Sequence, residues 1–565
     1  MVLLLRELSK ERLMNHTREI SRYVRLSGSE DESRALRYVR TQMEGSGFEV
    51  REHRFESYVG VPEMACLKVV GFKKEHGGTA PAISASTPSE GLEAELVDVG
   101  RGGSFDQLDL KGKVALIHGL CSPLLVKIAE EKGAVAEVFV NDSHAHEGIA
   151  SPVWGTPTPE TAKELPRTPS MSITQANGRE LSALLKKNGQ LRVVLRTRVK
   201  NEWTKVPVLT ADLEAKQDFV LLSGHIDSWH LGAMDNASGN ALMMEVGRVL
   251  SEHRELLKRG LRIAFWSGHS HGRYSGSAWY ADNFWEELYE RCVAHVNVDS
   301  VGAVGATDLT RQQVMKEAEE FVTTAVHEAT GQRATGVRFA RAGDQSFWGL
   351  GITSMLCEVS EQANRGSGSD LTPWGWWWHT PQDTIDKIDP DFLLRDANVY
   401  LRVVGGLCSG EVLPFKFEAT AREIERVLGE LSASADERVD LVRVTAEVRD
   451  LRRLVRKLER NRGASGEKAR IMNDALKRLG RLLIPVNYTK AGQFDQDLAV
   501  PTDPLPGLRN ILRLREIDPA SDEYRFLATR LQRETNRTLH AILEAKRVVE
   551  RALVELDVVD SKDAD

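Results

Sequence analysis

The sequence from Phe219 to Gly239 is FVLLSGHIDSWHLGAMDNASG. It begins with a short apolar run, typical of a buried strand, and continues through a Gly-rich turn into an amphipathic helix predicted at 240–253. Two more apolar segments, at 261–266 and 294–298, predict further buried strands. Because strands and helices alternate along this block, we expect an α/β fold with a mainly parallel sheet flanked by helices.

The α/β domain is predicted in two parts, residues 1–60 and 206–412. In the first part, Ser29 and Glu32 form a capping box at the start of a helix, and an alternating strand follows. Gly, Pro and Ser then become frequent, which indicates an inserted domain over 61–205. A strand–helix–strand pattern within this segment suggests a small βαβ-like module.

Residues 413–565 are predicted to form a helical domain. Apolar residues here step by three and four along a segment rich in Arg and Glu, as in an amphipathic helix. Two interpretations are open: this helix packs on its own domain, or its apolar seam joins a second copy of the chain. The seam residues are Leu441, Val444, Val448, Leu451, Val455 and Leu458.

The chain has 565 residues, with 75 Lys and Arg against 82 Asp and Glu, so its formal net charge is −7. This balance gives no polycationic footprint, and we expect no nucleic-acid partner. The first apolar run ends at Arg6 and Glu7, too early for a signal peptide or a membrane span, so we expect a cytoplasmic protein without a membrane partner. The five cysteines include no CxxC pair, and any metal ion must therefore bind to histidines and carboxylates.

Candidate metal ligands follow the predicted strands. His225 and Asp227 leave the first strand together, and such a histidine can bind a metal ion while the carboxylate orients its ring. Asp235, in the Gly-rich turn, is a candidate bridge between two cations. Asp299, at another strand end, and His379, in the sequence His-Thr-Pro-Gln-Asp-Thr, are weak candidates alone. Together the four potential ligands indicate a metal site.

With these motifs the chain resembles the zinc exopeptidase family that includes aminopeptidase Y, glutamate carboxypeptidase and the transferrin receptor. The resemblance covers most of the chain and is densest over residues 206–410. The shared patterns are His225-x-Asp227, Gly232-Ala233-x-Asp235-Asn236-Ala237-Ser238-Gly239, Asn297-x-Asp299 and His379-Thr380-Pro381-x-Asp383-Thr384.

The resemblance implies a sheet of the phosphorylase/hydrolase type, a protease-associated domain in the insertion, and a dimerisation domain at the C-terminus, hence a homodimer. It also implies one or two divalent metal ions, zinc above all, and the imidazole-rich ligand set allows Fe, Mn, Co or Ni as well. In the family pattern, His225 and Asp299 would hold one ion, Asp235 would bridge, and His379 would hold the second.

The chain departs from the family where two consecutive glutamates, a general base and a metal ligand, are expected. Residues 267–277 read SGHSHGRYSGS, and counting back from the final Gly-Ser places Ser270 at the base and His271 at the ligand. With one carboxylate fewer the site becomes more electropositive, and hydrolysis by a metal-bound hydroxide is still expected, because the cation lowers the pKa of water. His269 or His271 could relay the proton, and which of them is the ligand stays open.

Four tryptophans closely precede His379. If His379 binds a metal ion, Trp377 and Trp378 would form an aromatic wall for substrate beside it; the alternative is a packed loop core or a subunit contact. Asp344 and Glu358 are further substrate-binding candidates, because the sequence Gly-Asp-Gln-Ser-Phe at Asp344 resembles a family segment near the pocket.

The sequence therefore predicts a metal-dependent hydrolase that cleaves an amide or peptide-like C–N bond in a small substrate. Two alternatives stay open. Residues 268–272 spell G-x-S-x-G between a strand and a predicted helix, so Ser270 could be the nucleophile of a serine hydrolase. The chain could also be a non-catalytic binding or scaffold protein, as the resemblance to the transferrin receptor allows, although the retained candidate ligands argue against this.

Overall fold

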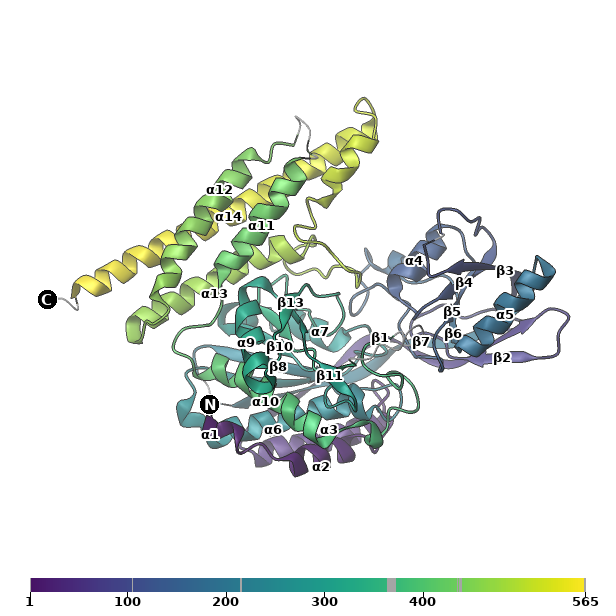
Figure 1. Cartoon of the computed structure of the whole chain (residues 1–565), viewed down its shortest axis with the longest axis horizontal. Coiled ribbons are helices and arrows are strands. Elements are labelled where there is room, and N and C mark those ends of the chain that lie inside the picture. The colour runs from purple at the N-terminus through teal and green to yellow at the C-terminus, as the bar shows by residue number, and fades with distance from the viewer. Residues whose placement is uncertain are drawn as a thin grey trace.

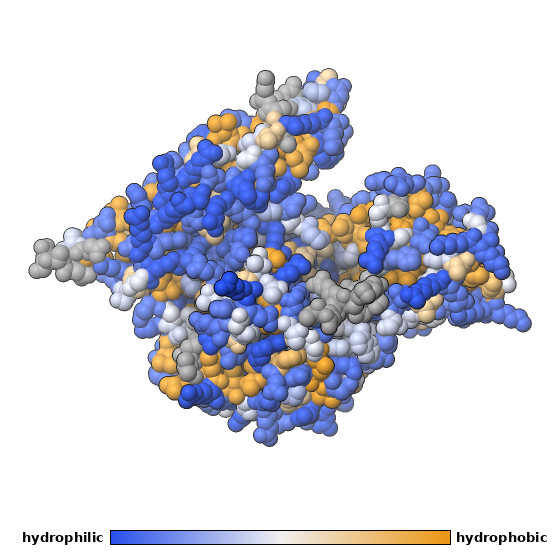
Figure 2. Space-filling view, viewed as in Figure 1, coloured by the Kyte–Doolittle hydropathy of each residue, from blue (hydrophilic) through white to orange (hydrophobic). Residues whose placement is uncertain are grey.

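The computed structural model describes residues 2–103, 105–213, 216–362, 372–433, 435 and 439–562. Figure 1 shows three regions: an α/β domain that contains the N-terminus, an inserted domain beside it, and a C-terminal arm of long helices. In the space-filling view of Figure 2, the arm and the inserted domain rise from the α/β domain on either side of a notch.

Four parallel strands form the centre of the α/β domain, and they confirm the predicted fold class. Their order is β14-β10-β8-β9, and every residue of β8, β9 and β10 is buried. Antiparallel strands flank them, with β7 next to β9 and β12 next to β14. The strands are β7 (Arg192–Leu213), β8 (Phe219–His225), β9 (Gly260–Trp266), β10 (Cys292–Asn297), β12 (Arg311–Val314), β13 (Thr335–Val337) and β14 (Ser354–Leu356).

Helices cover both faces of this sheet, which explains why its central strands are continuous apolar runs. On one face, α6 and α10 bury Leu222 and Ile263; on the other, α7 and α8 pack over Leu221 and Trp266. The Ser29 hydroxyl accepts a hydrogen bond from Glu32 N (3.1 Å), so α3 begins with the predicted cap. The helices are α1 (Val2–Leu5), α2 (Lys10–Ile20), α3 (Glu30–Gly45), α6 (Gly239–Glu252), α7 (Ser275–Asn283), α8 (Trp285–Arg291), α9 (Glu319–Thr330) and α10 (Pro390–Ser409).

Two long strands join the inserted domain to the α/β domain. β1 (Glu49–Val69) and β7 pair antiparallel from Glu49 to Val69, and both run through the predicted boundaries near residues 60 and 206. The sheet thus continues without a break into the insertion, in the order β7-β3-β4-β5-β6, with β2 on β1. The insertion contains β2 (Glu75–Gly78), β3 (Leu92–Gly100), β4 (Lys113–His118), α4 (Pro123–Glu131), β5 (Ala136–Val140), β6 (Ser170–Ile173) and α5 (Gln175–Asn188).

The C-terminal arm consists of α11 (Phe417–Ser432), α12 (Val442–Leu458), α13 (Gly466–Tyr488) and α14 (Asp522–Lys562). All six residues of the predicted apolar seam are buried within this chain, where α12 packs against α11 and α14. The seam is therefore intramolecular, because neighbouring helices of the same chain cover it. None of the helices in the described part of the chain has the length and apolar composition of a membrane span.

A buried carboxyl in the inserted domain makes stability depend on pH. Glu137 lies on β5, where one carboxyl oxygen accepts from Thr168 and Ser170 hydroxyls and the other has no partner. Burial raises its pKa to about 8, although the bonds from Ser170 and Thr168 oppose this rise. Since this folded-state pKa exceeds the unfolded value of about 4.3, the contribution of Glu137 to stability falls as pH rises from about 4.3 towards 8.

We therefore expect Glu137→Gln to gain stability relative to the native chain as pH rises, by up to about 1.4 kcal/mol per pH unit. Thermal unfolding at pH 5.5 and pH 8, followed by circular dichroism, measures the difference. Glu93→Gln, at an exposed side chain paired with Arg192, is the matched control and should show no such trend. An equal Glu137→Gln effect at both pH values would contradict the expectation.

Candidate metal centre

Three parallel strands end at the same edge of the sheet, and a candidate ligand follows each of them. His225 ends β8, while His269 and Asp299 lie just after β9 and β10. The carboxyl ends of neighbouring parallel strands meet, which brings residues far apart in sequence together. Ligand atoms of His225, His269 and Asp299 lie within 4.8 Å of one another.

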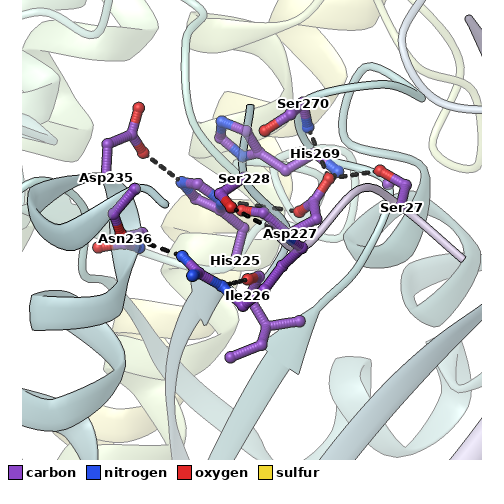
Figure 3. Close-up of polar contacts among 12 residues, drawn as sticks. Ser27, His225, Ile226, Asp227, Ser228, Asp235, Asn236, His269 and Ser270 are labelled. Atoms are coloured by element: carbon purple, nitrogen blue, oxygen red, sulfur yellow. Dashed lines mark hydrogen bonds and ion pairs between the residues drawn. The ribbon is translucent and has the colours of Figure 1, made fainter. Parts of the chain in front are cut away.

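His225 presents one ring nitrogen to two carboxylates. Its Nδ1 lies 2.9 Å from the backbone oxygen of Asp227, which can only accept, so Nδ1 carries the proton and donates. Its Nε2 lies 2.9 Å from Asp235 Oδ1, as Figure 3 shows, and 3.3 Å from Asp299 Oδ1. Burial disfavours the charged ring, but Asp299 and contacts with Asp227 and Asp235 raise the pKa of His225 well above its usual value. The pocket around Nε2 therefore favours a cation.

Asp235 is held in a tight turn between β8 and α6. The turn requires glycine at Gly232, where φ is +52° and a Cβ would lie 2.3 Å from Asp235 O. From the other side, the Asp383 carboxylate accepts from Met234 N (2.9 Å) and Asp235 N (3.0 Å). Burial raises the pKa of Asp383 to about 7, and the two hydrogen bonds from the backbone oppose this rise. Asp383, from the predicted His-Thr-Pro-x-Asp motif, thus positions the bridge candidate.

His379 lies on the opposite side of Asp235 from His225. Its Nε2 is 2.9 Å from Asp235 Oδ2, and its Nδ1 is 3.0 Å from the backbone oxygen of Glu147, to which it donates. Glu147 N donates in return to His379 O (2.9 Å). Asp235 therefore lies between two imidazoles, and the inserted domain supplies the acceptor that orients the second one.

His269 lies inside the site. Its ring stacks on His225 with centroids 3.8 Å apart, and its Nδ1 is 2.8 Å from Asp344 Oδ2. Asp344 is fully buried, and its other oxygen accepts from Ser277 Oγ (2.7 Å). Asp344 was a substrate-binding candidate, but it lies behind His269, outside the cavity lining, where it orients the ring so that Nε2 faces the site.

Ser270 and His271 lie differently from the positions of the family's glutamate pair. Ser270 N donates to Asp227 Oδ2 (2.9 Å), and in the described residues its hydroxyl makes no hydrogen bond to a histidine. His271 is completely buried, with Nδ1 3.0 Å from Ser27 Oγ and its ring packed on Trp229. The chain turns between His269 and His271, so the His271 side chain points into the domain and not towards His225.

Two residues near the N-terminus support the site, and no sequence motif indicated them. Ser27 Oγ donates to Asp227 Oδ2 (2.6 Å), as Figure 3 shows. The buried Arg25 guanidinium donates to the backbone oxygens of Ile226 (2.7 Å) and Gly232 (3.0 Å) and so fixes the turns on both sides of His225. Burial lowers the pKa of Arg25 to about 10. Asp227 stays ionised, because contacts with His225 and His271 lower its pKa despite its burial.

A cavity of about 450 Å³ opens beside these residues, and all three regions of the chain line it. Trp378 lines it and stacks on His379, with ring centroids 3.4 Å apart. Glu358, which accepts from Gln313 Nε2 (2.6 Å), also faces it. Trp377 does not line it, because its side chain packs in the domain core and is only 6% exposed.

The donor set fits a small divalent cation. Bonds of 2.0–2.1 Å from a tetrahedral zinc ion place neighbouring ligand atoms about 3.3 Å apart. The spacings of His225 Nε2 to Asp235 and Asp299, 2.9 and 3.3 Å, are close to that value. Asp235 Oδ1 is buried and accepts no well-directed hydrogen bond, as expected for an oxygen aimed at a metal ion.

Comparisons with known proteins found a matching family model and several relatives. Residues 208–404 match the model of Peptidase family M28. Probable glutamate carboxypeptidase VP8 of Zea mays is 23% identical over 500 residues, which cover 72% of this chain and 68% of that protein. Aminopeptidase YwaD of Bacillus subtilis is 24% identical over 404 residues, covering 67% of this chain and 80% of that protein.

Solved structures share the fold. The Peptidase M28 precursor from Shewanella amazonensis superposes with a TM-score of 0.58 at 21% identity, covering 73% of this chain and 96% of that one. The zinc aminopeptidase BSAP from Bacillus subtilis gives a TM-score of 0.53 at 22% identity, covering 72% and 96%. The predicted resemblance to the zinc exopeptidases is confirmed: the chain is a metallohydrolase, and its residues 208–404 match the model of Peptidase family M28.

Proposed function

We propose that this protein hydrolyses an amide or peptide C–N bond with one divalent cation, zinc being the expected ion, held by His225, His269, Asp235 and Asp299. The observation that carries the proposal is the convergence of His225, His269 and Asp299 beside a cavity, with Asp235 2.9 Å from His225 Nε2. Such a cation would polarise a carbonyl group and lower the pKa of a water molecule. The family match of residues 208–404 and the relatives named as peptidases support peptide-like substrates.

One ion is proposed because the second position has too few donors. A catalytic zinc site commonly has three protein ligands, and the group of three potential ligands found in the described residues, His225, His269 and Asp299, does not include His379. His271 would have been a third ligand with His379 and Asp235, but its ring faces Ser27 and Trp229. In place of the family's glutamate pair, we therefore propose His269 as a ligand of the single ion.

His379 is then free for proton transfer. It lines the cavity, and its Nδ1–H donates to the Glu147 backbone oxygen, so Nε2 is the atom that can gain or lose a proton. Asp235 Oδ2 lies 2.9 Å from this atom. We propose that His379 Nε2 accepts a proton during attack on the carbonyl and delivers it to the departing nitrogen.

The alternatives have less support. A serine nucleophile needs a histidine hydrogen-bonded to it, and Ser270 Oγ has none in the described residues. A binding protein would have no use for three imidazoles whose Nδ1 atoms are each fixed by an acceptor so that Nε2 faces the site. The predicted homodimer and cytoplasmic location stay predictions.

We expect about one equivalent of metal per chain in protein purified without chelator, measured by plasma mass spectrometry. Asp235→Asn and His269→Ala should lose it, because each removes a proposed ligand. His271→Phe keeps an aromatic ring on Trp229 and should retain the metal. Loss of metal in His271→Phe, with His269→Ala still loaded, would show that the two histidines have been assigned the wrong way round.

We expect hydrolysis of some members of a panel of aminoacyl anilides and N-acyl amino acids, measured by release of the amine. His379→Ala should keep its metal and lose about 100-fold or more in kcat, the usual contribution of a proton-transfer group. Ser270→Ala should retain nearly full activity. A metal-loaded Ser270→Ala protein without turnover would contradict the proposed mechanism and favour the serine hydrolase.

A further inference from the structure

Two arginines line the cavity and are almost completely buried, with Arg273 8% and Arg341 2% exposed. Each makes one hydrogen bond in the described part of the chain. Arg273 Nη2 donates to Ala499 O (3.4 Å), and Arg341 Nη2 donates to Asp497 O (2.9 Å). The Nε atom of each is buried and has no hydrogen-bond partner among the residues that the structure describes. Since a guanidinium has five N–H donors, both side chains keep most of their donors available.

Neither arginine has a carboxylate partner among the described residues, although burying an unpaired charge is costly. Burial lowers the pKa of Arg341 to about 10, although nearby Asp497 raises it, so the guanidinium is still charged at neutral pH. The acidic residues that line the cavity contact other groups: Glu147 accepts from Thr79, Glu358 accepts from Gln313, and Asp235 and Asp299 face His225. Asp497 acts on Arg341 only through space, and no carboxylate of the described residues forms a direct ion pair with either guanidinium.

An aromatic pair holds the two guanidinium groups in place. Arg341 lies 3.9 Å from the Trp154 ring centroid, and Arg273 lies 4.8 Å from that of Tyr274. Trp154 and Tyr274 pack against each other with centroids 4.2 Å apart. Cation–π contacts and the two backbone oxygens from one short segment of the C-terminal region thus fix both side chains before any ligand binds.

The arginine pair lies close to the proposed metal centre. The Tyr274 ring meets the His269 ring edge-on, with centroids 4.8 Å apart. Tyr274, His269 and both arginines line the same cavity. A small molecule whose amide carbonyl lies at His269 can therefore extend past Tyr274 to the guanidinium groups.

We propose that Arg273 and Arg341 bind a carboxylate of the substrate, so that the protein acts on amides or peptides that carry a free acid group near the scissile bond. A carboxylate supplies the missing negative charge and accepts paired N–H bonds from a guanidinium fork, which a neutral amide cannot do equally well. The inference rests on the proposed amide hydrolysis for the position of the reacting bond. The binding of the acid group itself requires no turnover.

The test uses two probes without a C–N bond, 3-benzoylpropanoate and its neutral counterpart 1-phenylpentane-1,4-dione. Each has an aryl ketone where the amide would be, and only one has a carboxylate. Isothermal titration of the full-length purified protein should show that the acid binds about tenfold or more tightly than the diketone. Arg273→Gln and Arg341→Gln should each reduce this preference to about twofold or less.

Arg338→Gln is the matched control. Arg338 is a mostly buried guanidinium that stacks on Tyr488 (4.1 Å) and donates to backbone oxygens, but it does not line the cavity. This variant should keep the full preference for the acid. If Arg341→Gln does not fold, as circular dichroism would show, Arg273→Gln decides the question.

Equal affinities for the two probes in the native protein would overturn the proposal, as would an acid preference that survives in folded Arg273→Gln. Metal content and amide hydrolysis are measured on the same preparation. An acid preference in a protein without metal or activity would support the carboxylate site and overturn the hydrolase function. Amide hydrolysis by a metal-loaded protein that shows no preference for the acid probe would support the hydrolase function and overturn the carboxylate site.

Discussion

The site depends on the fixed direction of three imidazole rings. In each ring, Nδ1 faces an acceptor: the Asp227 backbone oxygen for His225, the Asp344 carboxylate for His269, and the Glu147 backbone oxygen for His379. Because Nδ1 then holds the proton, Nε2 is the atom left to face Asp235, Asp299 or the cavity. The rest of the molecule serves to bring these three acceptors to one place, since they come from three separate segments.

The central sheet achieves most of this convergence. β8, β9 and β10 are fully buried parallel strands, so their carboxyl ends are fixed relative to one another, and the turns that follow carry His225, His269 and Asp299. The sheet does not fix the backbone that follows His225, and Arg25 does this. Its buried guanidinium binds backbone oxygens on both sides of the His225 turn and balances part of the negative charge that Asp227 and Asp235 place there.

The sequence was sufficient for the fold class and for the placement near one another of those candidate ligands that follow recognisable strands. The apolar runs at 219–223, 261–266 and 294–298 are strands, and His225 and Asp299 are near one another because such strands are parallel. The choice between His269 and His271 was beyond sequence reasoning. A change of one or two residues around a tight turn moves a side chain from the cavity to the core, and residue spacing alone does not show where the turn bends. Arg25 and Arg341 are long-range contacts, and no local pattern marks them.

The inserted domain is part of the site and not only a neighbour of it. Glu147 and His379 exchange hydrogen bonds, and the buried His146 contacts the backbone oxygen of Trp378 (2.5 Å) next to it. A shift of this domain along the β1–β7 ribbon would therefore change both the orientation of His379 and the wall that Trp378 forms. The C-terminal region likewise orients the two cavity arginines, because the backbone oxygens of Ala499 and Asp497 accept hydrogen bonds from Arg273 and Arg341. The α/β domain supplies the proposed metal ligands, while the position of the proposed proton-transfer group and of the proposed carboxylate site depends on the regions packed against it.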